Sequence, residues 1–268
     1  MVALKSSGQT QQRDGPLRGL GVLVTRPARQ AGEFARKLAA CGARPVIFPA
    51  IVILPPENRA TLDAVHAKLG DYALAIFVSA NAVEHGVGDP ACWPDRLVTF
   101  APGPGTAEAL AAAGIRGVQA PPTRFDSEGL LALPALADVA GKRVVIFRGD
   151  GGRDLLASTL QDRGARVDCV ACYRRARPAS GVGDLLEALR EGRVDVVTVT
   201  SSEGLRNLWA VLDAGGRHLL RQRPLFVPHQ RIAEQAATLG LAAITTRGGD
   251  AGLIDGLIEW AANRQPTP

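Results

Sequence analysis

Small, hydroxyl-bearing and basic residues follow most of the short apolar runs in this chain of 268 residues. Hydroxyls and backbone N–H groups donate hydrogen bonds to carboxylates, and arginine adds charge-assisted bonds. If the runs are parallel strands, these residues gather beyond the carboxyl ends, where α/β sheets bind ligands. The pattern therefore predicts contacts to an anionic ligand. The candidate binding residues are Arg26, Ser79, Asn81, Gly105, Arg148, Gly149, Ser201, Ser202 and Arg231.

Each of these positions also has a purely structural interpretation. Ser79 and Ser201 can be ordinary helix N-caps, and the glycines within 103–105 and 149–152 can form tight turns between a strand and a helix. Neither glycine segment has the ending of a Walker motif, and 149–154 lacks the third glycine of a Rossmann fingerprint. At this stage the sequence leaves both interpretations open.

Classical catalytic groups are missing from these strand ends. The chain has four histidines without metal-ligand spacing, and only His229 follows an apolar run. Cys169 and Cys172 have the spacing of a redox or metal motif, but no second pair and no histidine cluster accompany them. We interpret these two cysteines as small buried apolar side chains in a strand. The sequence predicts neither a metal site nor a cofactor, and favours a function that depends on positioning.

Apolar runs alternate with helical patterns along the whole chain. In 28–40, apolar residues recur at intervals of three and four, as on one face of a helix, and 154–163 is a second such segment. The runs are continuously apolar, which is typical of strands buried on both faces of a parallel sheet. This alternation predicts an α/β fold with doubly wound sheets. The candidate strands are 21–25, 45–48, 74–78, 97–101, 117–120, 143–147, 167–173, 195–200, 224–227 and 242–246.

The second half of the chain repeats the first about 122 positions later. Val22-Leu-Val-Thr-Arg26 corresponds to Val144-Val-Ile-Phe-Arg148, and Phe77-Val-Ser79 corresponds to Val199-Thr-Ser201. A long repeat indicates a duplicated unit, and two similar units favour a ligand site in a cleft between them. Ten candidate strands also exceed one comfortable open sheet, so the repeat predicts two domains.

Two extended segments are too long for their strand–helix units. One is 50–54, which ends at Pro55-Pro56, and the other is 170–176. We expect them to be the two linkers where the chain crosses between the domains, paired as a short ladder.

Composition narrows the classes of function. Hydrophobic residues make up 46% and charged residues 21% of the chain, the balance of a soluble globular protein. The net charge of +5 suits an anionic partner. Aromatic residues make up only 4%, which argues against a single-stranded nucleic-acid binder with stacking platforms. Residues 1–18 lack the apolar core of a signal peptide. We expect them to be a flexible tail on a cytoplasmic protein that does not cross a membrane.

Short motifs stand in a fixed order from about 19 to 260. They are Val24-Thr-Arg-Pro27, Phe77-Val-Ser-Ala-Asn-Ala-Val83, Gly103-Pro-Gly-Thr-Ala-Glu108, Phe147-Arg-Gly-Asp-Gly-Gly-Arg153, Cys172-Tyr-Arg-Arg175 and Arg231-Ile-Ala-Glu234. In order and spacing, this set resembles the uroporphyrinogen-III synthase family. Gln230 departs from a common form of the family, in which proline follows the histidine, and this leaves the local loop shape open.

The resemblance implies a fold and a reaction. The fold is two α/β domains joined by a two-stranded linker, one domain from 19–50 and 176–262 and the other from 51–173. The implied enzyme is a cyclising lyase of haem and related tetrapyrrole biosynthesis. It converts linear hydroxymethylbilane, through a spiro intermediate, into uroporphyrinogen III with its terminal ring reversed. The resemblance implies no cofactor, a monomer, and at most transient contact with the preceding enzyme of the pathway. Substrate and product each carry eight carboxylates, in keeping with the basic charge.

The resemblance also singles out two side chains for the reaction. Tyr173 falls at the position of the family's linker tyrosine and is the first choice to donate a hydrogen bond to the departing hydroxyl. Thr106 is the second candidate, for contact with a carboxylate or a ring edge. Tyr173 can alternatively be a linker tyrosine that only packs.

Two other classes of function fit parts of the sequence. A two-domain binding protein would close on an anionic ligand without changing it. A nucleic-acid-associated regulator would exploit the positive charge and bind with a steep dependence on salt. The lack of a basic stripe or a helix-turn-helix pattern counts against the regulator.

Overall fold

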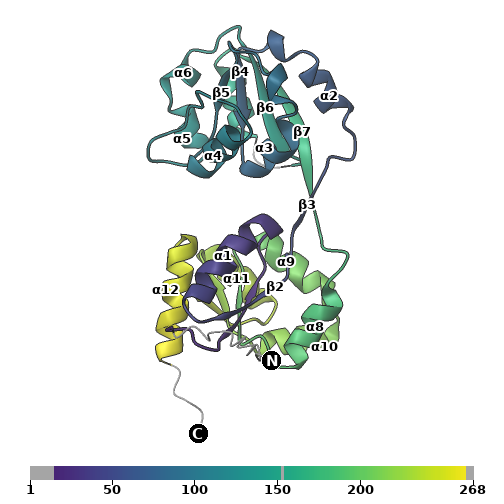
Figure 1. The fold of residues 1–268 in the computed structure, drawn as a ribbon, viewed down its shortest axis with the longest axis vertical. Helices are drawn as coiled ribbons and strands as arrows, with labels where there is room; N and C mark the ends of the chain where they lie inside the picture. Colours follow the sequence, from purple (N-terminus) through teal and green to yellow (C-terminus); the bar gives the residue numbers. More distant parts are fainter. Residues whose placement is uncertain (1–14, 152–153, 264–268) are drawn as a thin grey trace, which may run out of the picture. The chain divides into compact units, whose positions relative to one another are not determined.

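The chain forms two compact units in a computed structural model that describes residues 15–151 and 154–263. One unit comprises Met1–Val52 with Ala176–Pro268, and the other comprises Ile53–Arg175 (Figure 1). The chain therefore leaves the first unit, builds the second, and returns.

The first unit contains a five-stranded sheet in the order β10-β9-β8-β1-β2, in which the neighbouring strands run parallel. Its strands are β1 (Gly21–Val24), β2 (Arg44–Ile47), β8 (Val196–Thr198), β9 (Leu225–Val227) and β10 (Ala243–Thr245). Its helices are α1 (Ala28–Ala40), α8 (Val182–Arg190), α9 (Ser202–Val211), α10 (Ala214–Arg221), α11 (Gln230–Thr238) and α12 (Gly249–Ala262).

Helices cover both faces of this sheet because its strands are apolar on both sides. Val22 and Val24 of β1 belong to a core with α1 and α12, whereas Leu23 belongs to a core with α8, α9, α10 and α11. Successive residues of a strand point to opposite faces, so one run supplies both cores. The helical pattern of 28–40 is confirmed: α1 buries Ala31, Phe34, Ala35 and Leu38.

The second unit contains a sheet in the order β3-β7-β6-β4-β5. Its strands are β3 (Val52–Leu54), β4 (Leu74–Phe77), β5 (Val98–Phe100), β6 (Arg143–Gly149) and β7 (Arg166–Ala176). Its helices are α2 (Ala60–His66), α3 (Ala80–Gly86), α4 (Pro104–Ala112), α5 (Ser127–Leu131), α6 (Pro134–Ala137) and α7 (Leu155–Asp162), with short 3-10 turns at Leu69–Asp71 and Pro90–Cys92.

This sheet is also buried on both faces. Phe77, Val145 and Phe147 pack with α2, α3 and α4 on one face. Ile76 and Ile146 pack with α5, α6 and α7 on the other. The predicted α/β class with doubly wound parallel sheets is confirmed. Within the described residues, no helix is both long and apolar enough to span a membrane.

The sequence repeat corresponds to equivalent places in the two sheets. By the repeat, β1, β2, β8 and β9 match β6, β7, β4 and β5. The order β2-β1-β8-β9 in one sheet is then the order β7-β6-β4-β5 in the other. Each unit thus combines strands from both halves of the chain. The strand order reverses between β1 and β8 in the first unit and between β4 and β6 in the second, and ligands bind at such switch points.

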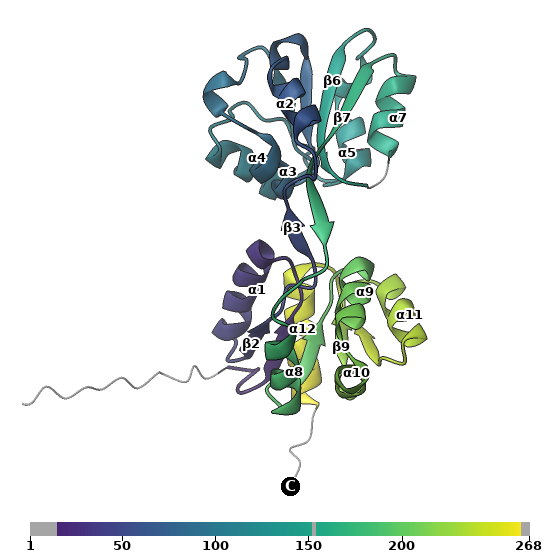
Figure 2. The same ribbon diagram turned by 90° about the vertical axis from the view of Figure 1, so that its right-hand side faces the viewer.

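The two segments expected as linkers are β3 and the end of β7. They are hydrogen-bonded neighbours in the sheet order and lie side by side in Figures 1 and 2. The chain passes between the units at Val52/Ile53 and again at Arg175/Ala176.

Three expectations from the sequence need correction. Residues 15–18 of the expected tail form a turn that buries Leu17 and binds the backbone of Cys41, because Leu17 joins the core under α1; residues 1–14 lie outside the described residues. The candidate strand 117–120 is only an isolated bridge between Gln119 and Phe100, since its side chains are largely exposed. Cys169 is exposed, whereas Cys172 is buried as expected.

Candidate functional site

The switch point of each sheet presents one arginine and one serine. In the second unit, Arg148 lies in β6 and Ser79 follows β4. In the first unit, Arg26 follows β1 and Ser201 follows β8. These pairs are equivalent in the sequence repeat. The structure therefore brings four of the predicted residues to the two places where the topology favours a ligand.

A β-bulge places Tyr173 at the switch point of the second unit. Arg148 of β6 is paired with Ala171 of β7, but the next residue, Gly149, is paired with Tyr173. Cys172 is therefore an extra residue in β7. In a regular strand Cys172 and Tyr173 would face opposite sides of the sheet. Both lie in the same core instead, because the bulge redirects the strand.

The ring of Tyr173 lies against the backbone of Gly149. A Cβ atom at Gly149 would come within 2.8 Å of two ring carbons of Tyr173, so this close approach requires glycine. The phenolic oxygen lies 3.3 Å from Oγ of Ser79, which also accepts a hydrogen bond of 3.1 Å from the backbone N–H of Ala82. The ring of His85 in α3 lies 6.2 Å from that of Tyr173.

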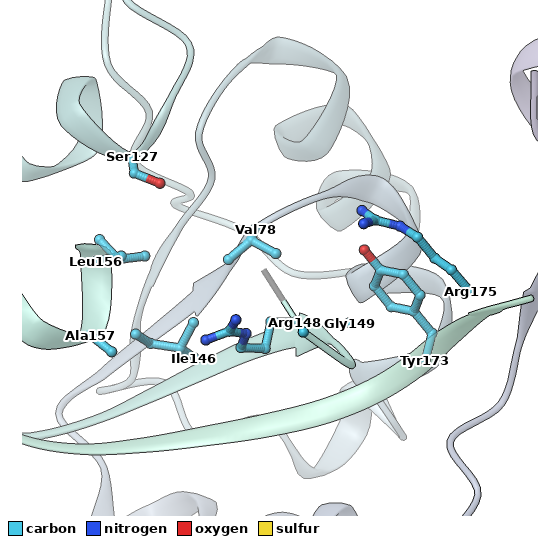
Figure 3. A pocket seen from close by; sticks show the side chains of 10 residues that line it. Val78, Ser127, Ile146, Arg148, Gly149, Leu156, Ala157, Tyr173 and Arg175 are labelled. Carbon is cyan, nitrogen blue, oxygen red and sulfur yellow. The ribbon is translucent and has the colours of Figure 1, made fainter. Parts of the chain in front are cut away.

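Tyr173 forms one wall of a pocket at the carboxyl edge of the sheet (Figure 3). The cavity has a volume of about 220 Å³, and its other walls include Val78, Arg148, Gly149 and Leu156. The tyrosine itself is only 1% exposed. The ring of Tyr173 is therefore part of the core, and the residue borders the pocket with very little accessible surface.

Two arginines give this pocket a positive character. Arg148 donates a 2.8 Å hydrogen bond to Asp154. This bond and the nearby Cys169 raise the pKa of the guanidinium, although burial alone would lower it. Its partner Asp154 is 82% exposed, so the pair is screened by water and exchanges readily for a ligand carboxylate. Arg175 extends beside the hydroxyl end of Tyr173 in Figure 3. The pocket can bind a carboxylate next to a phenol.

A second hollow continues this surface toward α5. It shares Val78, Ser127 and Leu156 with the Tyr173 pocket and extends to Phe125, whose side chain is 56% exposed. The shared walls join the two hollows along the carboxyl edge of the sheet. Asp126 and Glu128 also line the far hollow, so carboxylates of a ligand are favoured at the near end beside the arginines, and an apolar ring is favoured against Phe125.

Three other candidates in this unit occupy the first turns of its helices. Asn81 is half-buried in α3, and Gly105 is exposed in α4. Thr106 is 8% exposed and follows Gly105 in the same turn. Thr106 is not among the described residues that line the Tyr173 pocket. The role of Thr106 beside Tyr173 stays a prediction.

The switch point of the first unit is less open to a new anion. Arg26 forms an ion pair with Asp250 in the first turn of α12, and its guanidinium lies 4.5 Å from the ring centroid of Phe34. Lys37 of α1 binds the same carboxylate at 3.0 Å. Arg26 is therefore engaged inside its own unit, where it connects the end of β1 to α1 and α12.

The remaining candidates lie at helix starts of the first unit. Ser201 caps α9 by accepting a 3.0 Å hydrogen bond from the backbone N–H of Gly204, and Ser202 is the first residue of that helix. Arg231 is exposed in the first turn of α11. The structural interpretation of Ser79 and Ser201 as N-caps is correct. A cap accepts through its oxygen and leaves the hydroxyl hydrogen free to bind a ligand.

The cysteines do not add chemistry to the site. Burial raises the pKa of the Cys172 thiol to about 12, which makes it a poor nucleophile at neutral pH. Its Sγ donates to the backbone oxygen of Arg148 at 3.2 Å. Among the described residues, no group of three or more His, Cys, Asp or Glu side chains could hold a metal ion.

Sequence reasoning missed most of the residues that line the Tyr173 pocket, among them Arg175, Ser127 and Leu156. Arg175 had a usable signal: it stands two positions after Tyr173, and alternate residues of a strand share a face. Ser127 and Leu156 come from α5 and α7, and no local pattern in the sequence links them to β7.

Comparison with known proteins identifies the family. The family model described as "Uroporphyrinogen-III synthase HemD" matches residues 32–249. The uroporphyrinogen-III synthase of Escherichia coli is 36% identical over 228 residues, covering 82% of this chain and 92% of that protein. The enzyme of the same name from Salmonella typhimurium is 35% identical over 227 residues, with the same coverage. This chain belongs to the uroporphyrinogen-III synthase family.

Solved structures of the uroporphyrinogen-III synthase family agree in fold. The synthase of Thermus thermophilus superposes with a TM-score of 0.56 at 20% identity, covering 92% of this chain and 100% of that one. The synthetase of Helicobacter pylori gives a TM-score of 0.58 at 10% identity, covering 80% of this chain and 92% of that one. The family resemblance drawn from the sequence motifs is confirmed.

Proposed function

We propose that this chain is a cyclising lyase of tetrapyrrole biosynthesis that converts hydroxymethylbilane into uroporphyrinogen III with reversal of the terminal ring. Membership of the synthase family carries the reaction, because the relatives named for it match over 82% of the chain. The pocket at Tyr173 supports the location, since it combines a phenol, two arginines and a glycine-lined backbone at a switch point.

Binding of the substrate relies on its carboxylates. Arg148 and Arg175 are the groups of the second unit suited to acetate and propionate, by charge-assisted hydrogen bonds. In the first unit, Ser201, Ser202 and Arg231 offer hydroxyls and an exposed guanidinium. Arg26 is a weaker contact because Asp250 already neutralises it. Each of these contacts restricts the flexible chain of four pyrroles.

The chemical role of the protein begins with loss of the hydroxyl group. The C–O bond breaks with its electron pair on oxygen, driven by the adjacent pyrrole, which becomes an azafulvene. Tyr173 donates a hydrogen bond to the oxygen as the bond breaks. The departing oxygen takes up one proton and leaves as water, and the same pyrrole gives up its N–H proton as the neutral azafulvene forms, so the protons balance. A phenol has one O–H hydrogen that it can donate to such an oxygen. Thr106 has a secondary role, in contact with a carboxylate or a ring edge on the same unit.

The later steps depend on positioning. The terminal pyrrole attacks through its substituted carbon and forms a spiro intermediate, which fragments and recloses in the reversed orientation. Uncatalysed closure at the free carbon gives isomer I instead. Holding the reacting atoms in the less favoured geometry is an entropic contribution that needs no strong acid or base. This matches a site rich in backbone, hydroxyl and arginine groups.

The product isomers test this proposal. Purified chain is added to freshly generated hydroxymethylbilane, and the oxidised porphyrins are separated by chromatography. We expect mostly isomer III with folded protein, and isomer I with heat-denatured protein or buffer. Isomer I alone from the folded chain would contradict the enzymatic function, and binding of the substrate under those conditions would point to a binding protein instead.

A further inference from the structure

The hydroxyl of Ser79 has two neighbours, and only one of them belongs to its own helix. Its oxygen caps α3 by accepting from the N–H of Ala82 at 3.1 Å, and it lies 3.3 Å from the oxygen of Tyr173. The equivalent residue in the repeat, Ser201, makes the same kind of cap to Gly204 at 3.0 Å. At the offset of the repeat, Ile51 stands where the second half has Tyr173, and isoleucine has no hydroxyl. The contact to a phenol therefore distinguishes Ser79 from a plain cap.

The number of available hydrogens limits what this contact can do when substrate is bound. A serine hydroxyl has one hydrogen and two lone pairs. The N–H of Ala82 uses one lone pair and leaves the hydrogen free. If that hydrogen points to the oxygen of Tyr173, the phenolic hydrogen is free to point into the pocket. If the phenol donates to Ser79 instead, it has no hydrogen left for the substrate.

The surroundings of the phenol favour the first arrangement. Arg175 extends beside the hydroxyl end of Tyr173 in Figure 3, and a guanidinium has no acceptor that could take the phenolic hydrogen. Gly149 lies against the ring and leaves the phenol little freedom to turn away from Ser79. The separation of 3.3 Å is longer than a usual O–H···O bond. Hydrogen bonds of this type commonly tighten only when substrate is bound.

We propose that Ser79 is a positioning residue, which donates its hydrogen to the oxygen of Tyr173 and so directs the phenolic O–H at the departing hydroxyl of the substrate. This inference rests on the proposed synthase function and deepens it. The role assigned to Ser79 on sequence grounds was direct contact with a carboxylate. The two roles predict different kinetics, because a positioning residue acts only through Tyr173.

A double-mutant cycle separates these roles. The initial rate of isomer III formation is measured for the wild type, Ser79→Ala, Tyr173→Phe and the double variant. We expect Ser79→Ala to lower kcat by about tenfold with KM changed less than about twofold, since the contact serves the reacting step. In the Tyr173→Phe background the same change should lower kcat by less than about twofold, because the hydrogen bond is already gone. Ser79→Thr keeps the hydroxyl and should restore most of kcat.

A matched control removes a cap elsewhere. Asp213 caps α10 by accepting from Gly216 at 2.7 Å and lies outside the site. Asp213→Ala should lower Tm by about 2–4 °C, as Ser79→Ala does, while kcat stays near the wild-type value.

The possible outcomes are distinct. An equal loss of kcat from Ser79→Ala in both backgrounds, or a loss expressed mainly in KM, would overturn the positioning role and support direct contact with substrate. Unchanged kinetics in Ser79→Ala would overturn it as well. A wild-type chain that yields isomer I alone would refute the synthase function itself, and the positioning role with it.

Discussion

The pocket at Tyr173 depends on a fit between two neighbouring residues of parallel strands. The bulge at Cys172 turns the tyrosine onto the face where Gly149 is paired with it. Gly149 has no side chain, so the ring can lie directly on the backbone of β6. The position of the phenolic oxygen is thus set by backbone geometry as well as by its contact with Ser79.

Gly149→Ala should lower both activity and stability. The new Cβ would lie 2.8 Å from the Tyr173 ring, a distance at which something must shift. A displaced phenol should reduce kcat by about tenfold or more, since small errors in position are costly in catalysis. The overpacking itself should cost about 1–3 kcal/mol of unfolding free energy. Initial rates of isomer III formation and urea unfolding measure the two effects.

Gly183→Ala is the control for this change. A Cβ at Gly183 in α8 meets nothing within 4 Å, so the variant should keep wild-type activity and match or exceed wild-type stability. If Gly149→Ala were as active as Gly183→Ala, the ring of Tyr173 would not need its present position.

At the residue level, the sequence predicts which groups reach a strand end, but not which other group they meet there. Arg26 and Ser79 were placed correctly because a strand end is defined locally. The ion pair of Arg26 with Asp250 joins residues 224 positions apart, and nothing in either segment indicates it. The bulge at Cys172 depends on the register between β6 and β7, which the sequence of β7 alone does not contain.

Among the elements, α12 is attached to the first unit by charge as well as by its apolar face. Asp250 in its first turn is bound by Arg26 at the end of β1 and by Lys37 of α1. Burial tends to raise the pKa of this carboxyl, but hydrogen bonds from Lys37 and Arg26 outweigh that effect and lower it below its usual value. A negative charge at a helix N-terminus also interacts favourably with the positive end of the helix dipole.

Asp250→Asn should reduce the free energy of unfolding at neutral pH. In this variant the free energy of unfolding should also fall less as the pH is lowered. A pKa lowered in the folded state stabilises the protein above the unfolded pKa, near 4, and this contribution is lost as pH falls through the folded value. The loss at pH 7 should be on the order of 1 kcal/mol or less, because the carboxylate is partly exposed. Urea unfolding at pH 7, 4.5 and 3 measures it.

Asp255→Asn, in the same helix, is the matched control. Its pair with Arg247 is 3.4 Å long and solvent-exposed, so the variant should stay within about 0.5 kcal/mol of the wild type. If Asp250→Asn lost as much stability at pH 3 as at pH 7, the charge of Asp250 would not be what attaches α12.

Periodicity predicts the elements well where they are buried and poorly where they are exposed. Helix α1 has the predicted limits because its apolar face repeats every three or four residues. The run at 117–120 is apolar enough to suggest a strand, but its side chains remain largely outside the core. A strand needs partners along its length, and only Gln119 finds one.

For the molecule as a whole, duplication produced two equivalent switch points with different contents. Each has an arginine and a capping serine, but Arg26 is neutralised by Asp250, whereas Arg148 has an exposed partner. Tyr173 has no counterpart with a hydroxyl, because Ile51 stands at the corresponding position of the repeat. We infer that the second unit carries the reacting step and that the first contributes binding. That both act on one substrate molecule stays a prediction.

The turnover of Tyr173→Phe tests this account most directly. The variant removes one oxygen from a side chain that is otherwise core, so the fold should persist, which Tm and circular dichroism verify. We expect the rate of isomer III formation to fall by about tenfold to a hundredfold. This is at or below the lower end of the usual range for a proton donor, because the pyrroles of the substrate supply much of the driving force. A folded Tyr173→Phe chain that forms isomer III at the wild-type rate would contradict the assignment of the reacting step to this pocket.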